Sequence, residues 1–196
     1  MEKRAPQRED DKELICLCQG GDRAAFERLY RRYAQDVYTM AMRIVRSVEL
    51  AEEVTQEVFI SLYRDIQKFQ FQSAFTTWLY RIVYRRSADQ FRKIRKHKDH
   101  TVPLMPDDVN GARYEAVESG ANPADQAIEN EQQEMLEKAM DSLTPKQRAI
   151  LILRYTHHLS YEEIAHVLRC RIGTVKSRLN RAHKMMQEKL NQLEFF

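Results

Sequence analysis

Glycine, proline and cysteine are scarce in this sequence, and their shortage excludes several classes of protein. The 196 residues include five glycines, five prolines and three cysteines. Three cysteines are too few for a disulfide framework. The alternation of apolar and polar residues that marks β-strands is missing, while 43% of the residues are hydrophobic, which is enough for helical cores. We therefore predict an all-α protein.

Long apolar runs are also missing. No stretch approaches the roughly 20 apolar residues that cross a bilayer. The first residues, MEKRAPQREDDKEL, contain no apolar core of the signal-peptide type. We expect a cytoplasmic protein without membrane insertion.

Signatures of catalysis and of cofactor binding are absent from the sequence. It contains no glycine-rich phosphate loop, no Ser/His/Asp set and no carboxylates paired across a cleft. Cys16 and Cys18 face different ways on a helix, which favours inert packing over a redox or metal site. A zinc site is a further alternative. Its four candidate ligands are His157, His158, His166 and Cys170. The simpler interpretation is that these are polar histidines of a turn and a cysteine of the core. We expect no enzyme activity, no cofactor and no metal.

Charge is distributed unevenly along the chain. Residues 1–97 have a net charge of +5, residues 98–135 have −7 and residues 136–196 have +5. Prolines and glycines concentrate in 99–127, where no apolar period is sustained. We predict two small helical domains that face nucleic acid, at 11–97 and 128–193, joined by a flexible acidic linker at 98–127.

Residues 160–184 have the pattern of a helix, a turn and a second helix. Ser160 and Glu163 have the spacing of a capping box. Two apolar stripes at helical spacing follow, the first comprising Tyr161, Ile164, Ala165 and Leu168 and the second Ile172, Val175, Leu179, Ala182 and Met186. Upstream, the sequence TPKQ at 144–147 predicts another capped helix start, with its core in the apolar run 150–153. This arrangement is typical of a helix-turn-helix.

The second helix of this pair has a polar, basic face. At about 100° per residue, five residues lie opposite its apolar stripe: Gly173, Ser177, Asn180, Arg181 and Lys184. Lys176 and Arg178 flank them. Such a face suits a helix in the DNA major groove, where central side chains contact base edges and flanking cations contact phosphates. A solvated basic face on an ordinary helical hairpin is the alternative.

The N-terminal domain begins with three predicted helices, at 11–19, 23–46 and 49–66. Leu14, Ile15 and Leu17 are expected to face inward from the first. The third helix has an acidic outer side inside a basic domain, formed by Glu52, Glu53, Gln56 and Glu57. This side is either a solvated face or a docking surface for a basic protein partner.

Residues 68–98 combine aromatic and basic side chains. A loop at 69–73 leads into a helix with an apolar face and a row of arginines and lysines. Single-stranded DNA requires aromatic faces for its bases and cations for its backbone, and an aromatic loop with amides suits a flipped base. The alternative is that the aromatic side chains are buried in the core and that only the arginines are exposed. We expect Phe75 and Trp78 to be largely buried and the loop to contact the base.

Four motifs in order resemble those of the extracytoplasmic-function (ECF) sigma factors, which are alternative sigma factors of bacterial RNA polymerase. They are AEEVTQEVFISLYRDI at 51–66, FQSAFTTWLYRIVYRRSAD at 71–89, LTPKQRAILILRYTHHLSYEEIAHVL at 143–168 and GTVKSRLNRAHKMM at 173–186. The resemblance extends from about residue 11 to 190, excluding the linker. The sequence departs from the family's pattern at Glu53, where Asp is usual, at Arg169, where a turn glycine is common, and at Arg171, where Pro often opens the helix.

The resemblance implies a role for each matched segment and no catalysis. The clamp of the polymerase β′ subunit would contact Glu52, Glu53, Gln56, Glu57 and Phe59. The −10 promoter element would be melted and read by Phe69, Gln70, Phe71, Gln72, Ser73, Thr76, Arg81, Tyr84, Arg85 and Arg86. The −35 element would be read by Gly173, Thr174, Lys176, Ser177, Arg178, Asn180, Arg181 and Lys184. Further implied partners are the polymerase β flap and an anti-sigma factor, and the linker would thread the RNA channel.

A stand-alone helix-turn-helix transcription regulator is the competing function. Residues 1–97 would then sense a signal or dimerise, and the C-terminal helices would bind a palindromic operator without polymerase. The acidic linker and the aromatic, basic helix fit this alternative poorly. The promoter sequence, the regulon and the inducing signal do not follow from the sequence.

Overall fold

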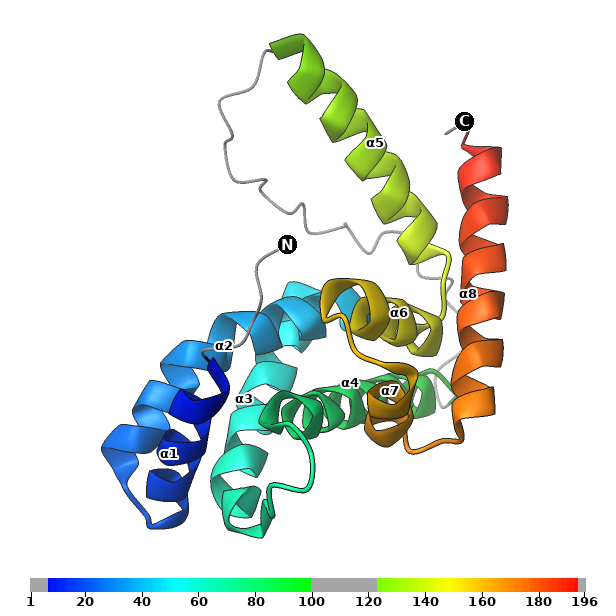
Figure 1. Ribbon diagram of the computed structural model, residues 1–196. Helices are drawn as coiled ribbons and strands as arrows, with labels where there is room; N and C mark the ends of the chain where they lie inside the picture. The colour runs from blue at the N-terminus through cyan, green and yellow to red at the C-terminus, as the bar shows by residue number, and fades with distance from the viewer. Residues whose placement is uncertain (1–6, 100–122, 194–196) are drawn as a thin grey trace. The chain divides into compact units, whose positions relative to one another are not determined.

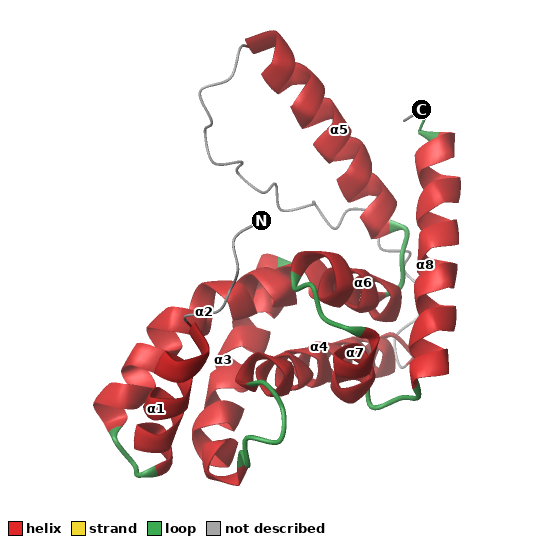
Figure 2. Cartoon of the chain, in the orientation of Figure 1, coloured by secondary structure: helices red, strands yellow, loops and turns green. Residues whose placement is uncertain are grey.

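The computed structural model describes residues 7–99 and 123–193, and every regular element in these ranges is a helix (Figures 1 and 2). In chain order the elements are α1 (Gln7–Gln19), α2 (Arg23–Val45), α3 (Val48–Asp65), η1 (Ile66–Lys68), α4 (Phe75–Asp99), α5 (Pro123–Asp141), α6 (Pro145–Leu151), η2 (Ile152–Thr156), α7 (Tyr161–Leu168) and α8 (Ile172–Gln192). The predicted all-α fold is confirmed. None of the helices in the described ranges has the length and apolarity of a membrane span.

The chain divides into two compact units, the first with α1 to α4 and the second with α5, α6, η2, α8 and the start of α7. In the first unit, α2 packs against α1, α3 and α4. Its core includes Leu29, Val37, Met40, Ile44, Val54, Val58, Leu62, Leu79 and Val83. Asp22 and Ser47 cap α2 and α3 by accepting hydrogen bonds from the backbone amides of Ala25 and Leu50, which satisfies donors that a helix start leaves free.

The first helix differs from its prediction in both extent and orientation. It begins at Gln7 rather than Asp11, and Leu17, expected to face inward, is 41% exposed. Leu14 and Ile15 are buried as predicted, and Cys18 takes the third inward position. Helical geometry explains the difference, because residues 14, 15 and 18 share one face at i, i+1 and i+4 while residue 17 points away. Burial raises the pKa of the Cys18 thiol.

The second unit contains both predicted capping boxes. The Thr144 hydroxyl accepts a hydrogen bond from the amide of Gln147, whose side chain accepts one from the amide of Thr144 at 2.9 Å. Ser160 and Glu163 make the same reciprocal pair at 3.1 and 2.8 Å. Between them, the π-helical turn η2 follows α6 directly. Both predicted helix starts are therefore confirmed with their capping residues.

The turn between α7 and α8 forms although glycine and proline are absent from it. Arg169 ends α7 in the left-handed region, with φ of 49°, a conformation that favours glycine at helix ends. Arg171 precedes α8 without a side-chain cap. Val175, Leu179 and Ala182 are buried as predicted, but Ile172 is 40% exposed. The predicted burial of Ile172 is therefore wrong, because helical periodicity does not show whether a neighbour covers the first turn of a helix.

The predicted linker at 98–127 overlaps two helix ends. Helix α4 continues to Asp99, and α5 begins at Pro123 rather than at residue 128. Pro123 suits a first helical position because its missing N–H needs no partner there. Linker residues 100–122 lie outside the described residues.

Candidate nucleic-acid and polymerase interfaces

Helix α8 presents a continuous polar face. The exposed residues of this face are Gly173, Lys176, Ser177, Asn180, Arg181 and Lys184, while Thr174 and Arg178 are half-buried. The apolar side of α8 packs against α6 and α5. A Cβ added at Gly173 would meet no atom within 4 Å, so the backbone at the start of α8 is open to close approach. All the residues predicted for this face therefore lie together on one helix.

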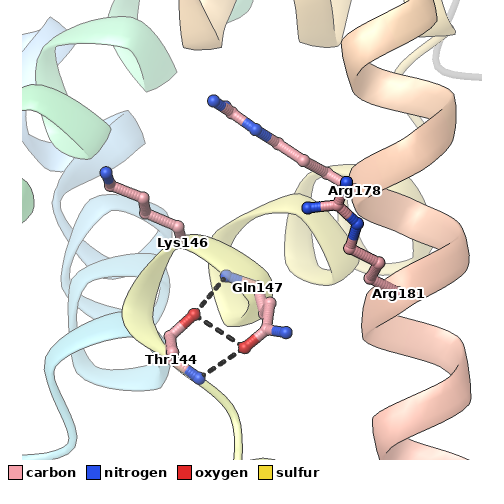
Figure 3. Close-up of a pocket in the computed structure, with 5 residues that line it drawn as sticks. All are labelled: Thr144, Lys146, Gln147, Arg178 and Arg181. Carbon is pink, nitrogen blue, oxygen red and sulfur yellow. Dashed lines mark hydrogen bonds between the residues drawn. The ribbon is translucent and has the colours of Figure 1, made fainter.

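A small pocket lies beside this face, between the start of α6 and the middle of α8 (Figure 3). Its volume is about 190 Å³, and it is lined by Thr144, Lys146, Gln147, Arg178 and Arg181. Lys146 extends from α6, and the two arginines extend from α8 (Figure 3). Three of the five lining residues are cations and none is acidic, so the pocket suits an anionic group such as a phosphate. The sequence did not indicate Lys146, because nothing in it places the start of α6 beside α8.

The loop between η1 and α4 buries one phenylalanine and exposes another. Phe69 is 5% exposed, and its ring centroid lies 4.9, 5.7 and 5.2 Å from those of Phe71, Phe75 and Trp78. Phe69 was predicted to contact DNA, but its side chain is buried. It packs against Phe75 and Trp78 and so holds the loop against α4. Phe75 is buried as expected, whereas Trp78 is only half-buried.

Phe71 is 39% exposed and has φ of 57°. This left-handed conformation is rare for a bulky residue. Its neighbours Gln70, Gln72 and Ser73 are exposed, and the Gln72 amide donates a hydrogen bond to Oε1 of Gln70 at 3.1 Å. The loop thus presents one aromatic ring and three polar side chains to solvent.

The basic residues of α4 do not all face outward. Arg85 is exposed, and Thr76, Arg81 and Tyr84 are half-buried. Arg86 turns toward α3, where its guanidinium donates hydrogen bonds to the Ser61 hydroxyl and lies 3.7 Å from a carboxylate oxygen of Glu57. Arg86 was predicted to contact DNA. In the structure it links α4 to α3, because Ser61 and Glu57 place acceptors directly across the helix pair.

The outer side of α3 combines acidic, polar and apolar residues. Glu52, Glu53 and Gln56 are exposed as predicted. Glu53 and Glu57 also lie near Lys93 of α4, with Nζ to carboxylate distances of 3.8 and 3.3 Å. Part of the acidic side is therefore already neutralised within the unit.

Phe59 does not belong to this outer side. It is 6% exposed, and its ring packs edge-on against Tyr30 at 4.6 Å. Ile60 and Tyr63, in contrast, are 67% and 56% exposed. Sequence reasoning missed them, although their spacing of i+4 and i+7 from Gln56 places them on the same stripe of the helix.

The candidate zinc ligands are not assembled into a site. His157 is buried, His166 is exposed and Cys170 is half-buried. Residues 7–99 and 123–193 contain no group of three or more His, Cys, Asp or Glu side chains placed to hold a metal ion.

Comparisons with known proteins agree on one family. Residues 29–97 match the family Sigma-70 region 2, and residues 133–186 match Sigma-70, region 4. The chain is 30% identical over 184 residues to the ECF RNA polymerase sigma factor SigW of Bacillus subtilis, covering 93% of this chain and 97% of that protein. It is 33% identical over 189 residues to the ECF RNA polymerase sigma-E factor of Escherichia coli K12, covering 93% and 95%.

Two solved structures share the fold. One is the sigma factor RpoE in complex with the anti-sigma factor NepR from Bartonella quintana, with a TM-score of 0.65 and 23% identity, covering 85% of this chain and 96% of that one. The other is CnrH in complex with the cytosolic domain of CnrY, with a TM-score of 0.63 and 18% identity, covering 93% and 97%. The first family match includes α3, the aromatic loop and most of α4, and the second includes the helix-turn-helix.

Proposed function

This chain belongs to the ECF sigma factors of bacterial RNA polymerase, and from that premise we propose how its two units share the work of promoter recognition. It is an alternative sigma factor that directs transcription initiation, and sigma factors are DNA-binding initiation factors rather than enzymes. We propose that the unit containing residues 29–97 binds core polymerase and the −10 element. The second unit, which contains α6 and α8, binds the −35 element.

Helix α8 is the proposed −35 reader. Ser177, Asn180 and Arg181 lie at the centre of its exposed face, where side chains can reach base edges in the major groove. Lys176 and Lys184 extend the positive charge along the helix. The pocket with Lys146 and Arg178 lies on one flank and suits a backbone phosphate. Helix α8 thus supplies the side chains for base recognition, and α8 together with the start of α6 supplies the phosphate contacts at the edge.

The observation that carries the −10 proposal is the exposed, strained Phe71. Partial exposure of an apolar ring costs free energy, and so does a left-handed backbone at a bulky residue. Both costs are offset if the ring stacks on an unpaired base, which contributes about 1–3 kcal/mol. Gln70, Gln72 and Ser73 are exposed beside it and supply donors and acceptors for a base edge. The exposed Arg85 and half-buried Arg81, Tyr84 and Thr76 of α4 continue the surface along the strand.

The outer side of α3 is the proposed docking surface for the β′ clamp. Glu52, Glu53 and Gln56 offer charge and hydrogen bonds to a basic partner, and Ile60 and Tyr63 add apolar area that a protein partner would cover. A further contact with the β flap is proposed for the second unit by family resemblance. Because both solved neighbours are described in complexes with an anti-sigma factor or a cytosolic partner domain, we also propose that an anti-sigma factor inhibits this chain.

The −10 proposal is tested with a fork-junction DNA that has an unpaired base, or an abasic site, at each position of the −10 strand. Holoenzyme with wild-type chain is expected to prefer the base at one position. Phe71→Ala should lose about tenfold of that preference, the equivalent of roughly 1.4 kcal/mol of stacking. Phe71→Leu is the matched control for side-chain volume, because leucine keeps apolar bulk without an aromatic face. This variant should lose nearly as much of the base preference as Phe71→Ala. Unchanged preference in both variants contradicts base capture by this loop.

A further inference from the structure

Helix α1 lies before residue 29, where the match to Sigma-70 region 2 begins. It is nevertheless hydrogen-bonded to the turn that leads into the loop between η1 and α4. Its last residue, Gln19, extends from α1 to the turn that ends α3. The Gln19 side-chain amide donates hydrogen bonds to the backbone oxygens of Ile66 at 3.0 Å and of Phe69 at 2.8 Å. These are two contacts between segments far apart in sequence, made by one side chain.

The chemistry of the partners fixes the orientation of this amide. Both partners are backbone carbonyls, which only accept hydrogen bonds, so the NH₂ group and not the oxygen of Gln19 must face them. The amide of Phe69 also donates to the oxygen of Ile66 at 3.0 Å. Ile66 and Phe69 are the two ends of one tight turn, and Gln19 connects their carbonyl groups across it. Once Gln19 is in place, the carbonyl of Phe69 has little freedom to rotate.

A second residue of α1, Asp11, is held near the same region. Asp11 accepts a buried hydrogen bond from the hydroxyl of Tyr33 at 2.6 Å. The ring of Tyr33 lies 5.3 Å from that of Phe75, the first residue of α4 and a neighbour of Phe69 in the aromatic cluster. Helix α1 is therefore held at Asp11 and at Gln19 by residues that border the loop, which restricts the position from which Gln19 approaches the turn.

We propose that Gln19 is a positioning residue for base capture: by holding the carbonyls of Ile66 and Phe69 it sets the path of the loop that presents Phe71. Phe69 is the last anchored residue before the exposed segment, and Phe71 follows two residues later in its left-handed conformation. Rotation of the Phe69 carbonyl would redirect the peptide that leads to Phe71. Gln19 acts through the loop and makes no contact with DNA. This inference rests on the proposed −10 function of the loop.

The test uses holoenzyme and the same fork-junction DNA, with base preference as the readout. Gln19→Glu replaces the NH₂ donors with a carboxylate that repels both carbonyls. Gln19→Asn keeps the amide but is one methylene too short to hold both. Gln19→Lys keeps cationic donors within reach. Gln35→Glu and Gln35→Lys are matched controls, because Gln35 is exposed on α2 and bonds only locally, to Thr39 at 3.3 Å.

Gln19→Glu and Gln19→Asn should each reduce the base preference about tenfold, while Gln19→Lys and both Gln35 variants should stay within about twofold of wild type. Affinity for a duplex −35 element and for core polymerase should not change in any of them. A purely structural role for Gln19 would lower the melting temperature and leave the preference intact. The inference is overturned if both Gln19→Glu and Gln19→Asn retain wild-type preference while Phe71→Ala loses it. If Phe71→Ala also retains it, the proposed base capture itself fails.

Discussion

Arg86 of α4 donates two hydrogen bonds to the hydroxyl of Ser61 on α3, from Nε at 3.1 Å and from Nη2 at 2.6 Å. The same guanidinium lies 3.7 Å from Oε2 of Glu57. An arginine of the basic helix α4 thus joins two helices. Its neighbour Arg85 is exposed. Adjacent arginines in one motif therefore differ in exposure and in contacts.

This difference predicts opposite phenotypes for two alanine variants. Arg86→Ala should lower the free energy of unfolding by about 1–2 kcal/mol, because the partly buried Ser61 hydroxyl loses both hydrogen bonds that it accepts and Glu57 keeps only Lys93 as a cationic neighbour. Arg85→Ala should leave stability unchanged and weaken binding to −10 DNA. Urea denaturation and fork-junction binding of both variants measure the two effects. Equal stability of the two variants would show that the Arg86 contacts contribute nothing.

The face of α8 and the pocket beside it predict two kinds of DNA contact. Arg181→Ala should reduce discrimination at one −35 base pair by about 1–3 kcal/mol, as expected for loss of a base-edge contact. Lys146→Ala should weaken binding to all −35 variants alike and reduce the slope of log affinity against log salt by about one. Holoenzyme binding to a −35 library at several salt concentrations separates the two. Uniform weakening by Arg181→Ala would make Arg181 a phosphate contact.

The apolar part of the α3 surface predicts a defect in polymerase binding without unfolding. Ile60→Asp places a charge where a protein partner would cover an apolar side chain, and it should weaken association with core polymerase at least about tenfold. Leu17→Asp is the matched control, since Leu17 is an exposed apolar residue of α1. Quantitative pull-down of core polymerase and thermal melting check both variants. If Ile60→Asp binds core as tightly as Leu17→Asp, the docking surface does not include Ile60.

Because Tyr33 is buried, we expect the stability of the fold to decrease at high pH. Burial, with the hydrogen bond to Asp11, raises its pKa well above the ordinary value of about 10. Above pH 10 the folded chain therefore keeps the phenol proton that the unfolded chain releases. The contribution of Tyr33 to the free energy of unfolding is complete below pH 10 and declines as the pH rises above it. Tyr33→Phe should cost about 1–2 kcal/mol at pH 8, and its difference from wild type should narrow above pH 10.

Urea midpoints measured between pH 8 and 11 check this expectation, with Tyr63→Phe as the control because Tyr63 is exposed. A constant difference between wild type and Tyr33→Phe across that range would contradict it.

Local chemistry made much of the fold predictable. The two capping boxes, at Thr144 and Ser160, depend on side chains three residues apart and appear as the sequence indicated. The exposed face of α8 follows in the same way from helical periodicity, because Val175, Leu179 and Ala182 fix which side is buried. These features need no information about distant parts of the chain.

The structure departs from the expectations where a distant neighbour decides the surroundings of a side chain. Phe59, Phe69 and Arg86 have the residue types that a polymerase or DNA surface uses, but Tyr30, the aromatic cluster and Ser61 engage them inside the unit. Lys146 and Gln19 were missed for the same reason, since their relevance appears only when α6 lies beside α8 and α1 lies beside η1.

Transcription by sigma-free core polymerase shows whether this chain directs initiation at specific promoters. Purified chain and core enzyme are combined with a library of promoters that vary at the −35 and −10 elements, and the RNA products are sequenced. We expect RNA only when the chain is present, from templates that share one sequence at each element, and loss of −10 selectivity with Phe71→Ala. No RNA from any template, together with tight binding of the chain alone to a palindromic duplex, would contradict it.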